Sequence, residues 1–184
     1  MDIKNKTVLV LGGYGLVGSA VVKQIVKEQP KEVIITSLFK TEVEEALLTY
    51  RKHFPELPKG YFKGWWGNIF VREEFKDADR NELLKNPKTR ATLIHDVMDD
   101  LDEEILENSA LYKLITTYNP DIIIDCINTA TAIAYQDVYS TYRDIKKVLN
   151  SKSNYNELAE LTEKLLCTMY TPQLIRHIQI LYAS

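Results

Sequence analysis

The stretch TVLVLGGYGLVGS, residues 7–19, decides the fold. Within it Val8–Leu11 is wholly apolar and rich in β-branched residues, which is typical of a strand buried on both faces of a parallel sheet. Four of the seven glycines in the chain follow within Gly12–Gly18. A helical pattern begins directly after them, so the stretch predicts a strand, a glycine turn and a helix in immediate succession.

A complete β-α-β unit extends this stretch to about thirty residues, the length that a parallel crossover needs. The helix is expected to run to about Glu28 and to end at Pro30. A second buried strand is expected over Glu32–Leu38. The residues expected on the buried face of the helix are Val17, Ala20, Val21 and Ile25.

The glycines match G-x-G-x-x-G from Gly13 and G-x-x-G-x-x-G from Gly12. Such a turn needs a positive φ angle, lets the backbone approach a pyrophosphate and allows close packing of helix on strand. The helix N-terminus then offers free N–H groups to the phosphates. We predict dinucleotide binding by Gly12, Tyr14, Gly15, Leu16, Val17 and Gly18. The alternatives are a tight turn without a ligand and a P-loop, although Ser19-Ala20 stands where a P-loop has Lys-Ser/Thr.

The end of the second strand bears on the choice between NADP and NAD. A carboxylate there would hold the ribose 2′-hydroxyl of NAD, but the strand ends Thr36-Ser37-Leu38-Phe39-Lys40. The first carboxylate, Glu42, lies in a helix start that we assign to a capping box of Thr41 and Glu44. Ser37 and Lys40 could hold a 2′-phosphate, so NADP is preferred over NAD. The alternative for Lys40 is a solvated loop lysine.

Strands and helices alternate along the rest of the chain, which predicts an α/β fold with a doubly wound, Rossmann-like parallel sheet of about five strands. We expect one domain over residues 1–184 with a helical insertion of two or three helices at about 71–119. The last predicted strand ends on the final residue, Ser184, so we expect the native protein to continue. The other predicted strands are Tyr61–Phe70, Asp121–Asn128 and Ile178–Ala183, and the later helices are Ala134–Leu149 and Tyr155–Met169.

In this order of segments the sequence resembles the extended short-chain dehydrogenase/reductase family, which includes nucleotide-sugar epimerases and dehydratases. The specific match is Gly12-x-x-Gly15-x-x-Gly18. Gly67-Asn68-Ile69 resembles the family's segment after the third strand, with Asn68 in place of the usual Asp. Asn128-Thr129-Ala130 resembles the segment after the fourth strand, and Ile180–Ser184 resembles the fifth strand.

The resemblance implies roles for these segments. Asn68 and Ile69 would contact adenine, and Asn128, Thr129 and Ala130 would line the ribose and nicotinamide side. The catalytic Tyr-x-x-x-Lys of the family would follow the end of this sequence, which leaves Ser184 as the catalytic candidate by position. Tyr142 and Lys146 have the same spacing on one helix face, but one element too early, and we interpret them as an ordinary surface pair.

Composition and residue spacing give no support for a nucleic-acid-binding, membrane-binding or metal-binding protein. A net charge of -3 gives no electrostatic reason to expect nucleic acid or an anionic membrane as partner. No metal site is predicted, because Cys and His show no ligand spacing and the acidic run His95–Glu104 lacks the EF-hand pattern. We interpret that run as a solvated face. Cys126 and Cys167 are expected to be reduced, buried thiols of a cytoplasmic protein, and the glycines argue against a signal peptide over residues 7–22.

Three functional hypotheses follow. The first is the cofactor domain of an NADP- or NAD-dependent oxidoreductase or epimerase-like enzyme, with a small-molecule substrate that the sequence does not identify. The second is a non-catalytic NAD(P)-binding sensor or scaffold. The third is a degenerate fold that binds no nucleotide and works through protein contacts. Sheet surface left unpaired near Ser184 would favour a homo-oligomer.

Overall fold

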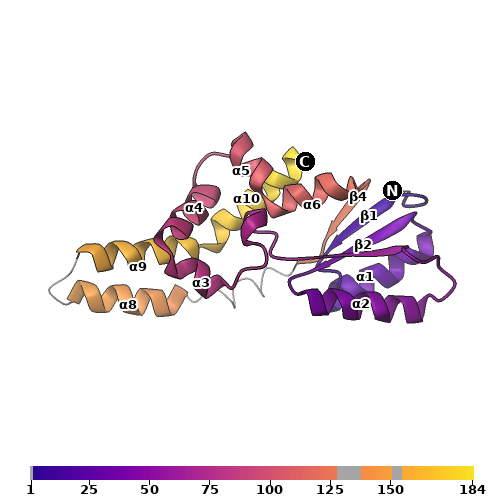
Figure 1. Cartoon of the computed structure of the whole chain (residues 1–184), viewed down its shortest axis with the longest axis horizontal. Coiled ribbons are helices and arrows are strands. Elements are labelled where there is room, and N and C mark those ends of the chain that lie inside the picture. The colour runs from indigo at the N-terminus through magenta and orange to yellow at the C-terminus, as the bar shows by residue number, and fades with distance from the viewer. Residues whose placement is uncertain (1, 128–137, 151–154) are drawn as a thin grey trace. The chain divides into compact units, whose positions relative to one another are not determined.

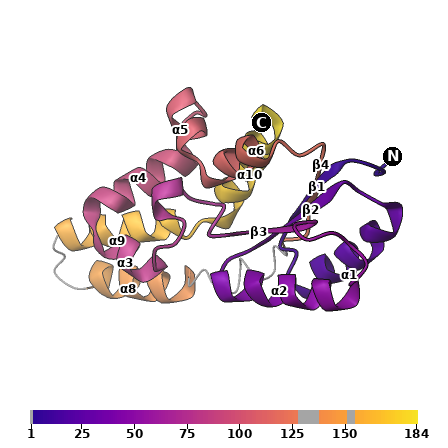
Figure 2. The ribbon, with the colours of Figure 1, turned by 45° about the vertical axis from the view of Figure 1, so that its right-hand side comes forward.

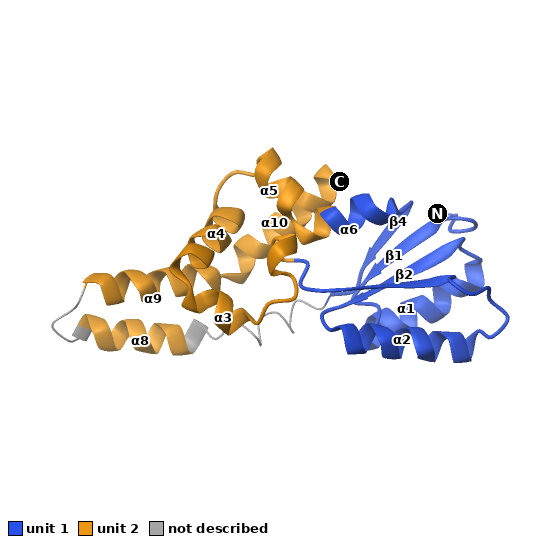
Figure 3. Cartoon of the chain, in the orientation of Figure 1, with its two compact units in different colours: residues 1–69, 113–127 blue, residues 70–112, 128–184 orange. Residues whose placement is uncertain are grey.

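The computed structural model describes residues 2–127, 138–150 and 155–184 of the chain (Figure 1). Its contacts divide the chain into two compact units (Figure 3). Unit 1 comprises Met1–Ile69 and Lys113–Ile127, and unit 2 comprises Phe70–Tyr112 and Asn128–Ser184. Most of the segment predicted as a helical insertion therefore folds in the same unit as the C-terminal helices.

Unit 1 contains an all-parallel sheet of four strands in the order β3-β2-β1-β4. This confirms an α/β fold with a parallel sheet, compatible with a Rossmann-like fold; the described residues form four strands where about five were predicted. β3 and β4 are shorter than predicted. The strands are β1 (Thr7–Leu11), β2 (Glu32–Ser37), β3 (Phe62–Trp66) and β4 (Ile122–Asp125).

Helices flank both faces of this sheet, which leaves β1 buried along its whole length (Figure 2). One face packs on α1 (Leu16–Ile25), which continues as a 3-10 turn over Val26–Glu28, and on α2 (Lys40–His53). The other face carries Leu9, Leu11 and Ile34, all fully buried, on the side where α6 (Ala110–Tyr118) lies. The core between the sheet and the first two helices includes Val8, Val10, Val33, Ile35, Val22, Ile25, Ala46 and Tyr50.

The buried face of α1 differs from the predicted one. Gly18, Val22 and Ile25 are buried and Val21 is half-buried, whereas Val17 and Ala20 are exposed. The spacing of 18, 22 and 25 is that of a single helix face. Sequence patterning missed the start of this face because glycine carries no apolar side chain to mark it.

The predicted fifth strand at Ile178–Ala183 is wrong, because these residues belong to α10 (Tyr170–Ala183). A short apolar run does not distinguish a buried strand from a helix. Here the run continues a helix whose buried residues are Arg176, His177 and Ile180, while Ile178 and Tyr182 are exposed. The expectation that the chain continues rested on this strand.

Unit 2 is helical in the part that the structure describes. Residues 71–119 form four α-helices, and not the predicted two or three. The last of them, α6, belongs to unit 1 from Lys113 onward and confirms the helix predicted from Leu111, Leu114, Ile115 and Tyr118. α4 packs on α9 and α10, and α8 packs on α9. The bounds are α3 (Arg80–Lys85), α4 (Pro87–Met98), α5 (Glu103–Asn108), α8 (Val138–Asn150) and α9 (Tyr155–Cys167).

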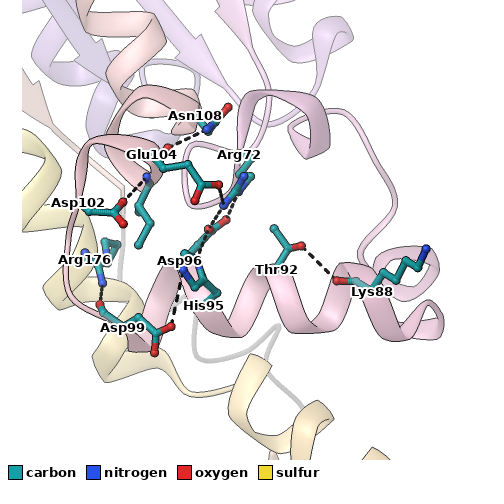
Figure 4. Close-up of polar contacts among 11 residues, drawn as sticks. Arg72, Lys88, Thr92, His95, Asp96, Asp99, Asp102, Glu104, Asn108 and Arg176 are labelled. Carbon is teal, nitrogen blue, oxygen red and sulfur yellow. Dashed lines mark hydrogen bonds and ion pairs between the residues drawn. The ribbon is translucent and has the colours of Figure 1, made fainter.

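A buried ion pair organises the acidic segment of unit 2 (Figure 4). The Arg72 guanidinium binds both oxygens of Asp96 at 2.8 and 2.7 Å and contacts Glu104 Oε1 at 2.9 Å. We call these three residues the Arg72 cluster. The prediction of a solvated face is therefore wrong for Asp96, which is buried, while Asp102 caps α5 through a hydrogen bond from the Ile105 N–H.

Two further expectations concern thiols and metals. Both cysteines are free; Cys167 is buried as predicted, whereas the prediction of a buried Cys126 is wrong, because that residue is only half-buried. Burial raises the pKa of each thiol. Across residues 2–127, 138–150 and 155–184, no group of His, Cys, Asp or Glu is arranged to hold a metal ion. In the same ranges no helix has the length and apolar character needed to cross a bilayer.

Candidate functional site

The glycine turn, residues 12–18, joins the carboxyl end of β1 to α1. Gly12 has a φ angle of 73°, in the left-handed region that glycine reaches without strain. Its N–H donates to Thr36 Oγ1 at 3.1 Å, so the turn is tied to the end of β2. The Gly15 N–H donates to Gly12 O at 3.1 Å and closes the turn on itself.

Gly18 is required by packing. A Cβ atom at this position would lie 2.1 Å from the carbonyl oxygen of Gly12 and 2.8 Å from the Cα of Gly13. Both are backbone atoms that cannot rotate away. The absence of a side chain at Gly18 is therefore what lets α1 pack close to the turn.

We expect Gly18→Ala to lower the free energy of unfolding of unit 1 by about 3 kcal/mol, the upper range for overpacking a tight site. Urea unfolding followed by circular dichroism measures the loss. Ser19→Ala, one residue along the same helix, is the control and should change stability by less than about 0.5 kcal/mol. Equal stability of the Gly18→Ala and Ser19→Ala proteins would contradict the packing role.

Gly15 differs from Gly18 because the fold does not require glycine there. Its backbone has φ -60° and ψ 170°, a conformation open to any residue. A Cβ atom would meet only Gly12 O, at 3.4 Å, an ordinary van der Waals contact. The open space beside Gly15 is what the close approach of a pyrophosphate to the backbone would use.

The N-terminus of α1 is suited to an anion. Gly15 is the N-cap residue, no side chain caps the helix, and the first turn holds no acidic residue. The N–H groups of the first turn and the positive end of the helix dipole therefore have no fixed negative partner among the residues that the structure describes. Leu16 and Val17 are 91% and 57% exposed at this end of the helix.

Two tyrosines connect the glycine turn to α2 and its neighbourhood. The buried Tyr50 hydroxyl donates to Gly13 O at 2.7 Å. The Tyr14 hydroxyl donates to Glu45 Oε2 at 3.2 Å, and this hydrogen bond is the main reason why the pKa of Tyr14 is raised. Helix α2 thus holds the turn through one buried and one exposed contact.

Burial raises the pKa of Tyr50 from 10.0 to about 12. The folded protein therefore keeps this proton at a pH where the unfolded chain loses it. Tyr50 therefore stabilises the fold fully below pH 10, and this contribution falls as the pH rises from 10 towards 12. The urea midpoint of the wild type should drop over that range, and Tyr50→Phe should flatten the drop while costing about 1–2 kcal/mol at pH 7. Tyr182→Phe, at an exposed position on α10, should leave the pH profile unchanged.

The structure places the predicted 2′-phosphate residues at the end of β2, but each has another partner. The Ser37 hydroxyl donates to Glu42 Oε2 at 2.7 Å. Lys40 Nζ lies 3.8 Å from Glu44 Oε1 and 5.2 Å from the centre of the Trp66 ring. The predicted Thr41–Glu44 capping box is wrong: α2 begins at Lys40, and Glu42 is the residue that accepts the N–H of the N-cap residue Phe39, at 3.3 Å.

Of the two segments predicted to contact adenine and nicotinamide, the structure describes the first, Gly67–Ile69. Gly67 directly follows β3, and its N–H donates to Ser37 O at 3.1 Å. Asn68 is half-buried and Ile69 is 4% exposed, so Ile69 offers almost no surface to a ligand. Asn128, Thr129 and Ala130 lie outside the described residues.

The catalytic candidate from position, Ser184, ends a helix and not a strand. Its hydroxyl donates to Ile180 O at 2.7 Å, within α10. The positional reason for selecting Ser184 therefore does not hold. Tyr142 and Lys146 lie on α8, where Lys146 Nζ is 6.0 Å from the Tyr142 ring centre and Tyr142 is 55% exposed, as expected for a surface pair.

Two residues that shape the site were missed in the sequence, and the role of a third was assigned differently. Thr36 accepts the Gly12 N–H, and the Tyr50 hydroxyl donates to Gly13 O. Glu42, assigned from the sequence to the start of a helix, also accepts a hydrogen bond from Ser37 at the end of β2. Thr36 could have been found, because parallel strands end at one edge and place it beside Gly12. Tyr50 gave no local signal, since its partner is thirty-seven residues away.

No protein-family model matches the chain, and no curated protein matches it. Among solved structures it is similar to the X-ray structure of Pen from Bacillus thuringiensis, with 15% sequence identity and a TM-score of 0.38. The match covers 83% of this chain and 50% of that one, so the chain spans about half the length of that protein. The family resemblance inferred from the sequence therefore stays a prediction.

Proposed function

We propose that unit 1 binds the pyrophosphate of a dinucleotide, NADP or NAD, at the glycine turn. The observation that carries the proposal is the contrast between Gly18 and Gly15. Gly18 is glycine because the fold demands it, whereas Gly15 sits at the uncapped helix N-terminus with room for a side chain. A glycine at position 15 would let an anion come close to the backbone N–H groups, which a side chain would prevent.

The proposed role of the bound dinucleotide is that of a redox cofactor in a short-chain dehydrogenase- or epimerase-like protein acting on a small molecule. Nicotinamide would supply hydride transfer at its ring. The chain's own residues would bind and orient: the N–H groups at the start of α1 hold the phosphates, and Thr36 and Tyr50 hold the turn in shape. This role follows from the sequence resemblance.

A second candidate is a binding module that senses the redox state of the dinucleotide pool. It is favoured by the helical structure of Ile178–Ala183 in α10, because the strand that would precede a catalytic Tyr-x-x-x-Lys was predicted at these residues. A sensor must bind the reduced and oxidised forms with different affinities. A more than tenfold difference between NADH and NAD, or between NADPH and NADP, would favour the sensor.

The test is a titration of the full chain with NADPH, NADP, NADH and NAD, followed by thermal shift and nicotinamide fluorescence. A dinucleotide that binds only the folded state adds about 2.7 kcal/mol at a hundred times its Kd. We expect a concentration-dependent rise in melting temperature with at least one of the four. No shift and no fluorescence change with any of them would refute the proposal and leave the hypothesis of a fold that works through protein contacts.

A further inference from the structure

We infer that the chain selects NAD(H) against NADP(H), and that Glu42 is the residue that sets this preference. The inference rests on the proposed function, since it concerns the adenosine ribose of the same dinucleotide. It reverses the preference expected from the sequence, where Ser37 and Lys40 were the candidates to hold a 2′-phosphate.

The Glu42 carboxylate lies at the end of β2. Ser37 ends β2, the strand next to β1 in the sheet. Its hydroxyl donates to Glu42 Oε2, and the Phe39 N–H donates to the same oxygen. These two hydrogen bonds hold the Glu42 carboxylate, from the first turn of α2, at the end of β2. This is where an acidic residue of the strand itself would lie in an NAD site.

This end of β2 contacts the glycine turn. Thr36, the residue before Ser37, accepts the Gly12 N–H at 3.1 Å, so the end of β2 adjoins the turn. Tyr14, in the turn, is also close to the acidic residues of α2. Its pKa is raised chiefly by Glu45 and more weakly by Glu42. A dinucleotide whose pyrophosphate lies at the turn brings its adenosine ribose to this end of β2.

The charge of Glu42 favours a ribose without a 2′-phosphate. An ionised carboxylate accepts hydrogen bonds from ribose hydroxyls but repels a 2′-phosphate, which carries close to two negative charges. Lys40, the cation nearest in sequence, already faces the carboxylate of Glu44 and the ring of Trp66. A 2′-phosphate would therefore meet a fixed negative charge and a lysine shared with another acid.

The experiment compares NADH with NADPH, and ADP-ribose with its 2′-phosphorylated form, by calorimetry on the full chain. We expect the wild type to bind the forms without a 2′-phosphate at least about tenfold more tightly. In Glu42→Gln the amide oxygen can still accept from Ser37 and Phe39, so the melting temperature should hold. The preference should fall by about tenfold, through tighter binding of the 2′-phosphorylated ligands.

Lys40→Gln is the matched variant that tests the alternative, in which Lys40 holds a 2′-phosphate. We expect it to leave the ratio of the two affinities unchanged. A wild type that prefers NADPH, or a Lys40→Gln protein that loses NADPH binding, would overturn the inference and restore the roles expected for Ser37 and Lys40. Failure of all four ligands to bind the wild type would instead reject the proposed function itself, so the two failures are distinguishable.

Discussion

Gly15→Asp is expected to weaken dinucleotide binding by about a hundredfold or more, while the fold remains as stable as the wild type. Aspartate is among the best N-cap residues, and its charge suits a helix N-terminus. The backbone at Gly15 already has an extended conformation and leaves room for a Cβ atom. The same carboxylate would stand where the pyrophosphate is proposed to lie, and like charges in such a place cost several kcal/mol.

Gly15→Asn separates charge from shape in this test. Asparagine caps a helix about as well as aspartate and has nearly the same size, so it occupies the same N–H groups without the charge. We expect it to bind the dinucleotide at least about tenfold more tightly than Gly15→Asp does. Calorimetry gives the affinities and thermal unfolding gives the stability. Unchanged binding in the Asp variant would place the phosphates elsewhere.

Arg72→Met should destabilise unit 2 by about 3–5 kcal/mol, the usual cost of leaving one partner of a buried ion pair uncompensated. Asp96 would keep a charge in a place where its side chain is 12% exposed, with its bidentate partner gone. The two hydrogen bonds that join Arg72 to α4 and the contact to Glu104 on α5 would be lost together. Chemical denaturation followed by circular dichroism measures the effect.

The double variant Arg72→Met/Asp96→Leu is the control for that prediction. Removing both charges avoids the uncompensated carboxylate, so most of the lost stability should return. Arg72→Lys should remain impaired, because an ammonium group cannot make the paired contacts of the guanidinium. A cost below about 1 kcal/mol for Arg72→Met would show that the pair is weak in spite of its burial.

The end of the second strand shows which contacts a local pattern does not record. Ser37 and Lys40 lie at this strand end, and the structure adds a hydrogen bond from Ser37 to Glu42 and an ion pair of Lys40 with Glu44. The sequence predicts a capping box of Thr41 and Glu44, whereas Glu42 is the residue that accepts the N–H of the N-cap residue Phe39. The error came from a helix start misplaced by one or two residues, which is the usual uncertainty of helix ends.

The apolar run near the C-terminus was misread for a different reason. Ile178–Ala183 has the composition of a buried strand, yet it continues α10 without a break. Pro172 did not stop the helix, since proline is tolerated in the first turn, where its missing N–H has no partner to lose. Burial of Arg176 and His177 beside Ile180 then defines the inner face of this helix.

The sequence by itself determined the local unit: β1, the glycine turn, α1 and β2 follow from hydrophobic periodicity and from the backbone freedom of glycine, both of which act over a few residues. Tertiary structure alone decided the long-range partners. Tyr50 reaches Gly13, Thr36 reaches Gly12, and Arg72 reaches Asp96. These pairs depend on which helix covers which strand, and that choice is made by burying the most apolar surface of the whole unit, which no local pattern records.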